Sequence, residues 1–332
     1  MTAAEDARSA RSGWLSATSL RTVLRDRPII PLISLLLGLV VMLEVLQPGI
    51  VNERWISNTI RFAIPLAILA AAQTLTMLTG GIDLSVGIVA TMTAFVMATQ
   101  AAFMDTALAI PLALGVAALA GLANGVGVGI FRVHPLIMTL AVGLVVEGLL
   151  LVYQRFVLGS SVDLPEAITW LGTGRSFGNI PNALLVFVPL ALLMGVLLGR
   201  TGFGRLLYAI GDNEGAARLA GVRVWQVLIV LYVLSALLAG VGGLLYVGLI
   251  KANSLSLAVP LLLPSVAAAV IGGTSIFGGR GGYAGTIVGA LILQVLATVL
   301  LVLQVPEGTR RVVFGIIILA VTAAYTRITQ EH

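Results

Sequence analysis

Long apolar runs recur along almost the whole of the 332-residue chain. About 20 apolar residues are what an α-helix needs to cross the hydrocarbon core of a bilayer. Ten such segments can be placed, at 29–47, 59–79, 83–104, 106–131, 134–155, 183–199, 224–249, 259–277, 283–304 and 310–326. Only 10% of the residues are charged, against about a quarter in soluble domains. The sequence therefore predicts an all-α polytopic membrane protein with a single transmembrane domain over residues 29–332.

The basic residues predict the orientation of these segments. Residues 1–28 carry five arginines and are expected to form a cytoplasmic arm. With this arm inside, twelve of the 19 lysines and arginines lie on the cytoplasmic side, so both termini are expected inside. This bias accounts for the net charge of +5 without a nucleic-acid partner. The segment 259–277 contains Pro260 and Pro264, and it could span the bilayer or form a re-entrant hairpin.

Two loops are long enough to hold structure of their own. One is an outer loop at about 156–182 and the other a cytoplasmic loop at about 200–223. Within the second loop, Asp212 or Asn213 can cap a short helix that ends at Gly221. A helix of this length is not stable alone, so we expect it to lie against another surface.

The stretch from Gly80 to Gly87 interrupts two apolar runs with glycines, a carboxylate and a serine. Asp83, followed two residues later by Ser85, is a plausible cap for the helix that begins next. An ionisable group within a span is costly. Asp83 therefore either caps segment three at the cytoplasmic edge or belongs to a broken helix that faces a translocation pathway.

Glycines at helical spacing predict close packing between helices. Gly121, Gly125 and Gly129 lie four residues apart, as do Gly281, Gly285 and Gly289. This spacing puts small residues on one helix face and lets two backbones approach.

Several kinds of chemistry are absent from the sequence. It has no cysteine and two histidines, His134 and His332, so we expect no metal site and no catalytic residues. The single lysine, Lys251, does not follow a glycine, so the chain has no phosphate-binding loop of the Gly-x-x-x-x-Gly-Lys type. We therefore expect no enzyme activity, no bound cofactor and no ATP hydrolysis by this polypeptide.

Four ordered motifs carry a resemblance to a known family. They are Gly-Gly-Ile-Asp-Leu-Ser-Val-Gly at 80–87, Gly-Leu-Ala-Asn-Gly at 121–125 followed by Pro-Leu-Ile-Met-Thr-Leu at 135–140, the loop at 208–221, and the glycine-rich run at 267–281. Together they resemble the ribose/xylose-type sugar permeases of the branched-chain amino acid/sugar permease superfamily. These permeases are the membrane subunits of bacterial ABC importers.

The resemblance implies a type II ABC importer-like permease bundle in the bacterial inner membrane. Its cargo would be a monosaccharide or a related polyol. The implied partners are a second permease subunit, in a homodimer or heterodimer, and an extracytoplasmic sugar-binding protein. Separate ABC ATPase subunits would bind the ATP and Mg.

Three sets of residues follow as candidates. The resemblance implies that the short cytoplasmic helix docks on the ATPase, through Asp212, Asn213, Glu214, Ala216, Ala217, Arg218, Leu219 and Gly221. Polar residues within or beside the spans could line the pathway, namely Gln73, Asp83, Ser85, Asn124, Glu147 and Thr274. Basic residues on the outer side could pair with the binding protein, namely Arg54, Lys251, Arg310 and Arg311.

Two departures from the family pattern leave alternatives open. Glu147-Gly148 stands where relatives commonly have Arg-Gly, and Leu262–Ser265 replaces an acidic run. Glu147 could accept hydrogen bonds from a sugar, pair with Arg155 or bond within the bundle. The cargo could instead be a branched-chain amino acid, a nucleoside or an autoinducer. A secondary transporter with Asp83 and Glu147 as coupling carboxylates is a further alternative.

Overall fold

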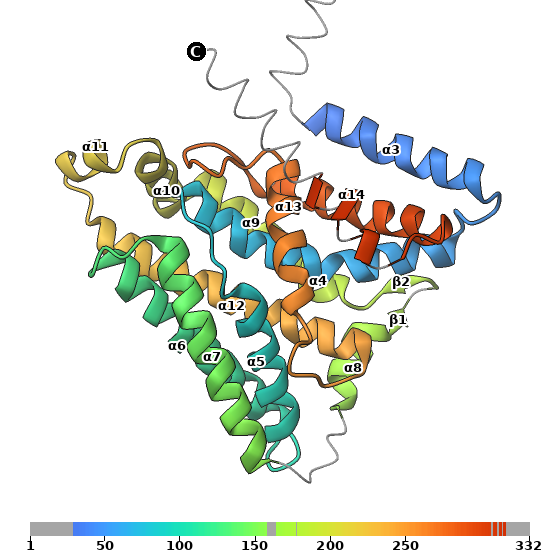
Figure 1. Cartoon of the computed structure of the whole chain (residues 1–332), viewed down its shortest axis with the longest axis horizontal. Coiled ribbons are helices and arrows are strands. Elements are labelled where there is room, and N and C mark those ends of the chain that lie inside the picture. The colour runs from blue at the N-terminus through green and yellow to red at the C-terminus, as the bar shows by residue number, and fades with distance from the viewer. Residues whose placement is uncertain are drawn as a thin grey trace, which may run out of the picture.

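The computed structural model describes residues 29–157, 164–176, 178–306, 308–310, 312–313 and 315–316. These residues form a helical bundle (Figure 1). By length and composition, six helices are candidate membrane spans: α3 (Ile29–Leu46), α4 (Glu53–Leu78), α6 (Thr106–Gly129), α7 (Pro135–Phe156), α12 (Val224–Ile250) and α14 (Tyr283–Val302). Helices α9 (Leu184–Arg200) and α10 (Gly202–Asp212) meet at 64° and would make a seventh span if taken together.

The remaining elements are short. They are α5 (Val86–Gln100), α8 (Glu166–Thr173), β1 (Arg175–Ser176), β2 (Ile180–Pro181), α11 (Glu214–Leu219), the 3-10 turn η2 (Val259–Leu261) and α13 (Leu262–Ile271). The strands β1 and β2 pair as an antiparallel hairpin.

Two of the ten expected segments are therefore shorter helices than predicted. Segment three begins at Val86 and not at residue 83, because the chain stays non-helical after Gly80. Segment eight is the short η2 and α13, which stop at Ile271 before the left-handed Gly273. Segment ten falls mostly outside the described residues.

Helix α4 forms the centre of the bundle. In its most apolar window 83% of the residues are buried, against 28% in α6 and α7 and 6% in α3. Its small residues, among them Ala67, Ala70, Ala71 and Ala72, are fully or almost fully buried and let neighbouring helices come close. Helix α12 crosses α4 and also packs on α5, α6 and α8. The apolar faces of α3, α6 and α7 point outward, as expected for a bundle in lipid.

The glycines of α6 make the predicted close contact with α12. A Cβ on Gly121 would lie 2.5 Å from the Tyr232 carbonyl oxygen, and one on Gly125 would lie 2.6 Å from Ile229 Cα. The interpretation of this spacing is confirmed. In the second set of glycines, the prediction of close packing is right for Gly285 and Gly289, which face the backbone of α13. It is wrong for Gly281, which lies in the loop before α14 and has a φ of 137°.

The loop 200–223 holds two helices where one was predicted. The short helix is confirmed as α11, and its cap is Asn213, whose side chain accepts a hydrogen bond from Ala216 N. Asp212 instead ends α10, which was not predicted. Helix α10 is amphipathic and buries Leu207 and Ile210, so it is stabilised by packing and not by length.

Candidate functional site

The break between α4 and α5 carries the buried carboxylate. Gly80 has a φ of 77°, in the left-handed region that favours glycine, and it turns the chain at the end of α4. The chain then runs through Asp83 and Ser85 before α5 begins at Val86. Asp83 is 1% exposed, so it lies in the interior and not at a surface turn.

Three donors satisfy the Asp83 carboxylate. Oδ1 accepts hydrogen bonds from Ser85 N at 2.9 Å and from Ser85 Oγ at 2.6 Å. Oδ2 accepts one from Ser235 Oγ, in the middle of α12, at 2.9 Å. Asp83 does not cap segment three as expected, because the N-cap of α5 is Ser85 and Asp83 Oδ1 accepts from the N–H of Ser85 itself. Its side chain lies in the interior against the middle of α12, and its place at the cytoplasmic edge stays a prediction.

Three other helices also form hydrogen bonds with the segment Asp83–Ser85. Gln73 of α4 donates from Nε2 to the Asp83 carbonyl oxygen at 2.8 Å. Asn124 of α6 donates from Nδ2 to Ser85 Oγ at 2.9 Å, and Thr139 of α7 accepts from Leu84 N at 3.0 Å. We call the six side chains of Gln73, Asp83, Ser85, Asn124, Thr139 and Ser235 the Asp83 cluster. They are all 0–1% exposed.

The Asp83 cluster ties four helices to one break in the chain. A buried polar group costs about 1–3 kcal/mol when it is left without a hydrogen bond, so these bonds specify how α4, α6, α7 and α12 meet. One acceptor, Asn124 Oδ1, has no hydrogen-bond partner. Four of the six predicted pathway residues are therefore neighbours, namely Gln73, Asp83, Ser85 and Asn124. Their role in a pathway stays a prediction.

Thr139 and Ser235 were missed by sequence reasoning. Thr139 lies inside the 135–140 motif, four residues after Pro135, whose carbonyl oxygen it also binds at 2.9 Å. Its place in this motif could have identified Thr139 as a candidate from the sequence. Ser235 is a single serine in a 27-residue apolar helix, and nothing in its neighbourhood marks it.

The other two pathway candidates lie elsewhere. Thr274 is 1% exposed in the loop after α13, and its Oγ1 has no hydrogen-bond partner. Glu147 is exposed on the outer face of α7. The expected ion pair between Glu147 and Arg155 is wrong, since the ion pairs of the described residues are those of Glu214 with Arg132 and Arg218. Bonding of Glu147 inside the bundle is also wrong, because its side chain faces away from the core.

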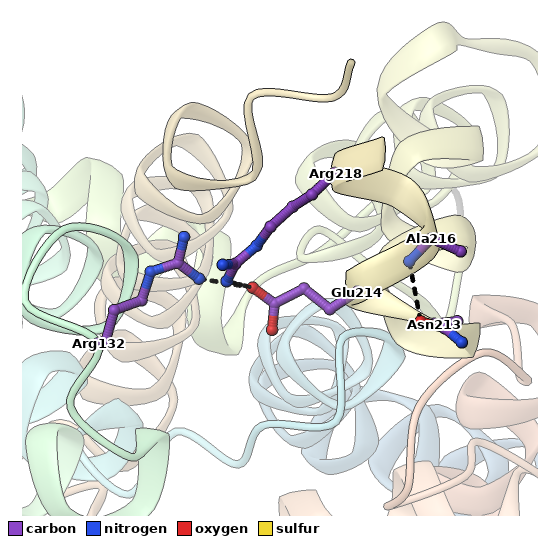
Figure 2. A network of polar contacts seen from close by, with 5 residues as sticks. All are labelled: Arg132, Asn213, Glu214, Ala216 and Arg218. Atoms are coloured by element: carbon purple, nitrogen blue, oxygen red, sulfur yellow. Dashed lines mark hydrogen bonds and ion pairs between the residues drawn. The ribbon is translucent and has the colours of Figure 1, made fainter. Parts of the chain in front are cut away.

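The second candidate site is the surface around α11. Figure 2 shows the side chains of Arg132 and Arg218 meeting the Glu214 carboxylate from different elements. Arg132 lies in the α6–α7 loop with a φ of 59°, and its Nη1 is 2.6 Å from Glu214 Oε1. Arg218 is one turn along α11 and binds the same oxygen. The carboxylate thus joins α11 to the loop between two spans.

Helix α11 presents one face to the protein and another to its surroundings. Ala217 is buried in a cluster with Leu207 and Ile210 of α10. Leu219, in contrast, is 93% exposed. Helix α11 is therefore held to the protein at Ala217 and leaves Leu219 exposed.

The structure describes three of the four basic residues that were predicted to contact the binding protein. Arg54 and Lys251 are exposed, and Arg310 is half-buried. Arg311 lies outside the described residues. A nearby network was not predicted: Arg61 and Arg175 both donate to Asn58 Oδ1, at 2.9 and 2.8 Å. The sequence gives no sign of the contact with Arg175, because Arg175 is 117 positions from Asn58.

Similarity to known proteins extends over nearly the whole chain. Residues 55–322 match the family described as the permease component of the branched-chain amino acid transport system. The chain belongs to this permease family. Both the Asp83 cluster and α11 lie inside the matched region of the permease. Among the described residues of the permease, no group of three or more His, Cys, Asp or Glu side chains could hold a metal ion.

Relatives of the permease include named sugar importers. It is 34% identical over 290 residues to the ribose import permease of Escherichia coli (strain K12), covering 86% of this chain and 89% of the relative. It is 35% identical to the ribose import permease of Bacillus subtilis (strain 168), covering 85% and 87%. It is 34% identical to the fructose import permease of Rhizobium meliloti, covering 88% and 83%. No solved structure matches the chain.

Proposed function

We propose that this chain is the permease subunit of an ATP-driven, binding-protein-dependent importer that carries a monosaccharide or a related polyol across the bacterial inner membrane. The observation that carries the proposal is identity of about one third, along most of the chain, to permeases named for ribose and fructose. The ATP and Mg belong to separate ATPase subunits, because this sequence has no phosphate-binding loop.

The predicted orientation of the termini and the spans is part of this proposal. We propose ten crossings with both ends inside, so that α11 faces the cytoplasm while α8 and the hairpin face outward. This proposal takes segment eight as a crossing, although its helix α13 covers only Leu262–Ile271. The segment follows the end of α12, and Ala258 N donates to Thr91 Oγ1 of α5 at 3.0 Å. At its other end, Gly279 N donates to Leu78 O at the C-terminal end of α4.

Helix α11 is the element that docks on the ATPase. Support comes from its exposed Leu219 and from Glu214, which is 43% exposed although two arginines bind it. The Asn213 cap and the buried Ala217 fix the helix, so its ordering is complete before a partner arrives. A partner can then bind it with a smaller loss of backbone conformational entropy.

Reversing the charge of Glu214 should uncouple the ATPase. Glu214→Arg places three arginines side by side and turns an acidic contact of the docking surface basic, and like charges across an interface cost several kcal/mol. We expect sugar-stimulated ATP hydrolysis by the reconstituted complex to fall about ten-fold or more. The fold should survive, because exposed ion pairs contribute only about 0–1 kcal/mol.

The matched control for Glu214 is Arg132→Gln. It breaks the same ion pair from the other side and leaves the α11 sequence intact. We expect a change of less than about two-fold, since the pair is solvent-exposed. Normal coupling in Glu214→Arg would show that α11 does not dock on the ATPase.

A second permease subunit would cover the exposed face of α7. Glu147 lies on this face among exposed leucines and valines, including Leu144, Val145 and Leu149. A carboxylate at the centre of a span costs about 3 kcal/mol in lipid, and such groups usually face a bundle interior or a water-filled cavity. We therefore place Glu147 toward a passage between two subunits, which makes it the leading pathway residue.

On the outer side, we propose that the sugar-binding protein contacts Arg54, Lys251, Arg310 and Arg311, of which Arg54 and Lys251 are exposed. Exposed basic groups there would steer the encounter with an acidic partner surface. A binding protein that holds the sugar outside also explains why the permease itself needs only weak contacts with it.

An ionophore experiment tests the energy source. Uptake of labelled sugar would be measured in cells after the ion gradients are collapsed and the ATP level is held. The proposal expects uptake to persist, because Asp83 is bonded to three internal donors and is not available as a coupling carboxylate. Loss of uptake at constant ATP would point to a secondary transporter.

One other cargo is favoured by a specific observation. The description of the matched family names branched-chain amino acids. Binding of ribose, fructose and leucine to the partner binding protein would separate the two classes. Tight binding of leucine and none of a sugar would replace the proposed cargo while leaving the proposed architecture intact.

A further inference from the structure

Three segments of main chain meet at the C-terminal end of α10. They are the end of α4, the last residues of α10, and the loop 272–282 between α13 and α14 (Figure 1). Gly279 N donates to Leu78 O at 3.0 Å. A Cβ on Gly278 would lie 2.7 Å from the Gly211 carbonyl oxygen and 3.0 Å from Gly80 N. We call these five residues, Leu78, Gly80, Gly211, Gly278 and Gly279, the glycine junction.

Gly211 is the residue that allows this contact. It lies inside α10, where alanine is the better helix former, and it is not among the glycines with positive φ. Its own backbone conformation therefore does not require glycine. A Cβ at this position would collide with the Leu78 carbonyl oxygen and lie 2.5 Å from Gly279 N. Both are main-chain atoms, which cannot rotate away.

On one side, the glycine junction is connected to α11 through α10. Ala217 of α11 packs in the same buried cluster as Leu207 and Ile210 of α10. The Tyr208 hydroxyl donates to Gly281 O at 2.9 Å, which fastens α10 to the loop 272–282. These contacts link α11 through α10 to the loop 272–282.

On the other side the junction leads to the Asp83 cluster. Gly80 precedes Asp83 by three residues, and the Asp83 carboxylate binds Ser235 of α12. The bonds of Asn124 and Thr139 extend the contact to α6 and α7. Closely packed interiors have low compressibility and transmit strain. Main-chain segments in direct contact therefore pass a displacement on to one another.

We infer that the glycine junction is the joint through which movement of α11 by the ATPase reaches the Asp83 cluster, with Gly211 as its positioning residue. The inference rests on the proposed function for the existence of that ATPase. The three segments of the junction move as one unit, and the helices around Asp83 follow.

A side chain added at Gly211 tests the inference, because it would separate the segments of the glycine junction. Gly211→Ala would be assayed in the complete complex in proteoliposomes, for both sugar uptake and ATP hydrolysis. We expect uptake to fall about ten-fold, a size typical of substitutions that act on coupling, while the complex assembles and still hydrolyses ATP. The control is Gly202→Ala in the same helix, where a Cβ meets only Arg205 Nη2, at 3.9 Å.

A disulfide across the junction tests the same point in one sample, so that the strain of a cysteine at Gly279, whose φ is 70°, is present before and after oxidation. The chain has no cysteine, and Asp212 Cβ lies 3.5 Å from a Cβ built on Gly279, within the range for a disulfide. In Asp212→Cys/Gly279→Cys, uptake would be compared before and after oxidation of the same sample. Because the segments move together, oxidation should leave uptake unchanged.

The outcomes separate the inference from the proposed function. Three results would contradict the inference that the glycine junction transmits the movement. They are normal uptake in Gly211→Ala, an equal loss of uptake and ATP hydrolysis in that variant, and loss of uptake when the cysteine pair is oxidised. Absence of ATP-dependent uptake in the unmodified complex would instead overturn the proposed function. If Gly211→Ala fails to fold, the cysteine pair still decides.

Discussion

Replacing Asp83 with leucine is expected to destabilise the protein severely. The substitution leaves Ser85 N–H and the hydroxyls of Ser85 and Ser235 buried without their acceptor. At about 1–3 kcal/mol for each unsatisfied group, the free energy of unfolding should fall by about 3 kcal/mol or more. That is a large fraction of the 5–15 kcal/mol that is typical of folded domains. Thermal unfolding in detergent would measure it, and uptake should be lost with the fold.

The control for Asp83→Leu is Asp83→Asn, which has nearly the same shape and keeps Oδ1 as an acceptor. Its amide can donate to Ser235 Oγ, because a hydroxyl both donates and accepts. We therefore expect Asp83→Asn to fold nearly normally and to keep most of its uptake. A folded Asp83→Asn without uptake would show that the negative charge itself serves the pathway.

The second large effect is expected where α6 meets α12. In Gly121→Ala the new Cβ would lie 2.5 Å from the Tyr232 carbonyl oxygen, 2.7 Å from Ala236 Cβ and 2.8 Å from Val233 Cα. The two helices must move apart, and overpacking of this kind typically costs about 1–3 kcal/mol. The melting temperature in detergent should fall accordingly.

Gly115→Ala is the matched control for Gly121→Ala. It lies in the same helix, and a Cβ there meets nothing within 4 Å. Alanine is favoured over glycine in a helix by about 1 kcal/mol, so Gly115→Ala should be neutral or stabilising. Equal effects of the two substitutions would show that the contact with α12 does not limit stability.

The sequence predicted most of the fold because the bilayer imposes a simple rule. Apolar runs near 20 residues became helices at α3, α4, α6, α7, α12 and α14. The rule failed at α5 and α13, which are shorter because glycines and prolines break the chain beside them. It also missed α10, because a packed amphipathic helix carries no membrane signal.

The sites were predictable only in part, for a physical reason. Asp83, Gln73 and Asn124 stood out because polar groups are rare in spans. Ser235 and Arg132 did not, since their importance comes from partners far away in the sequence. Glu147 was recognised as unusual, but only the structure shows that its side chain leaves the core.

The measurement that tests the central claim most directly is sugar uptake by the reconstituted transporter. Proteoliposomes would contain this permease and its ATPase with ATP trapped inside, and the binding protein with labelled ribose or fructose would be added outside. The account predicts uptake that requires ATP, the ATPase and the binding protein together. Uptake that continues without ATP, or that carries neither sugar when all the components are present, would contradict it.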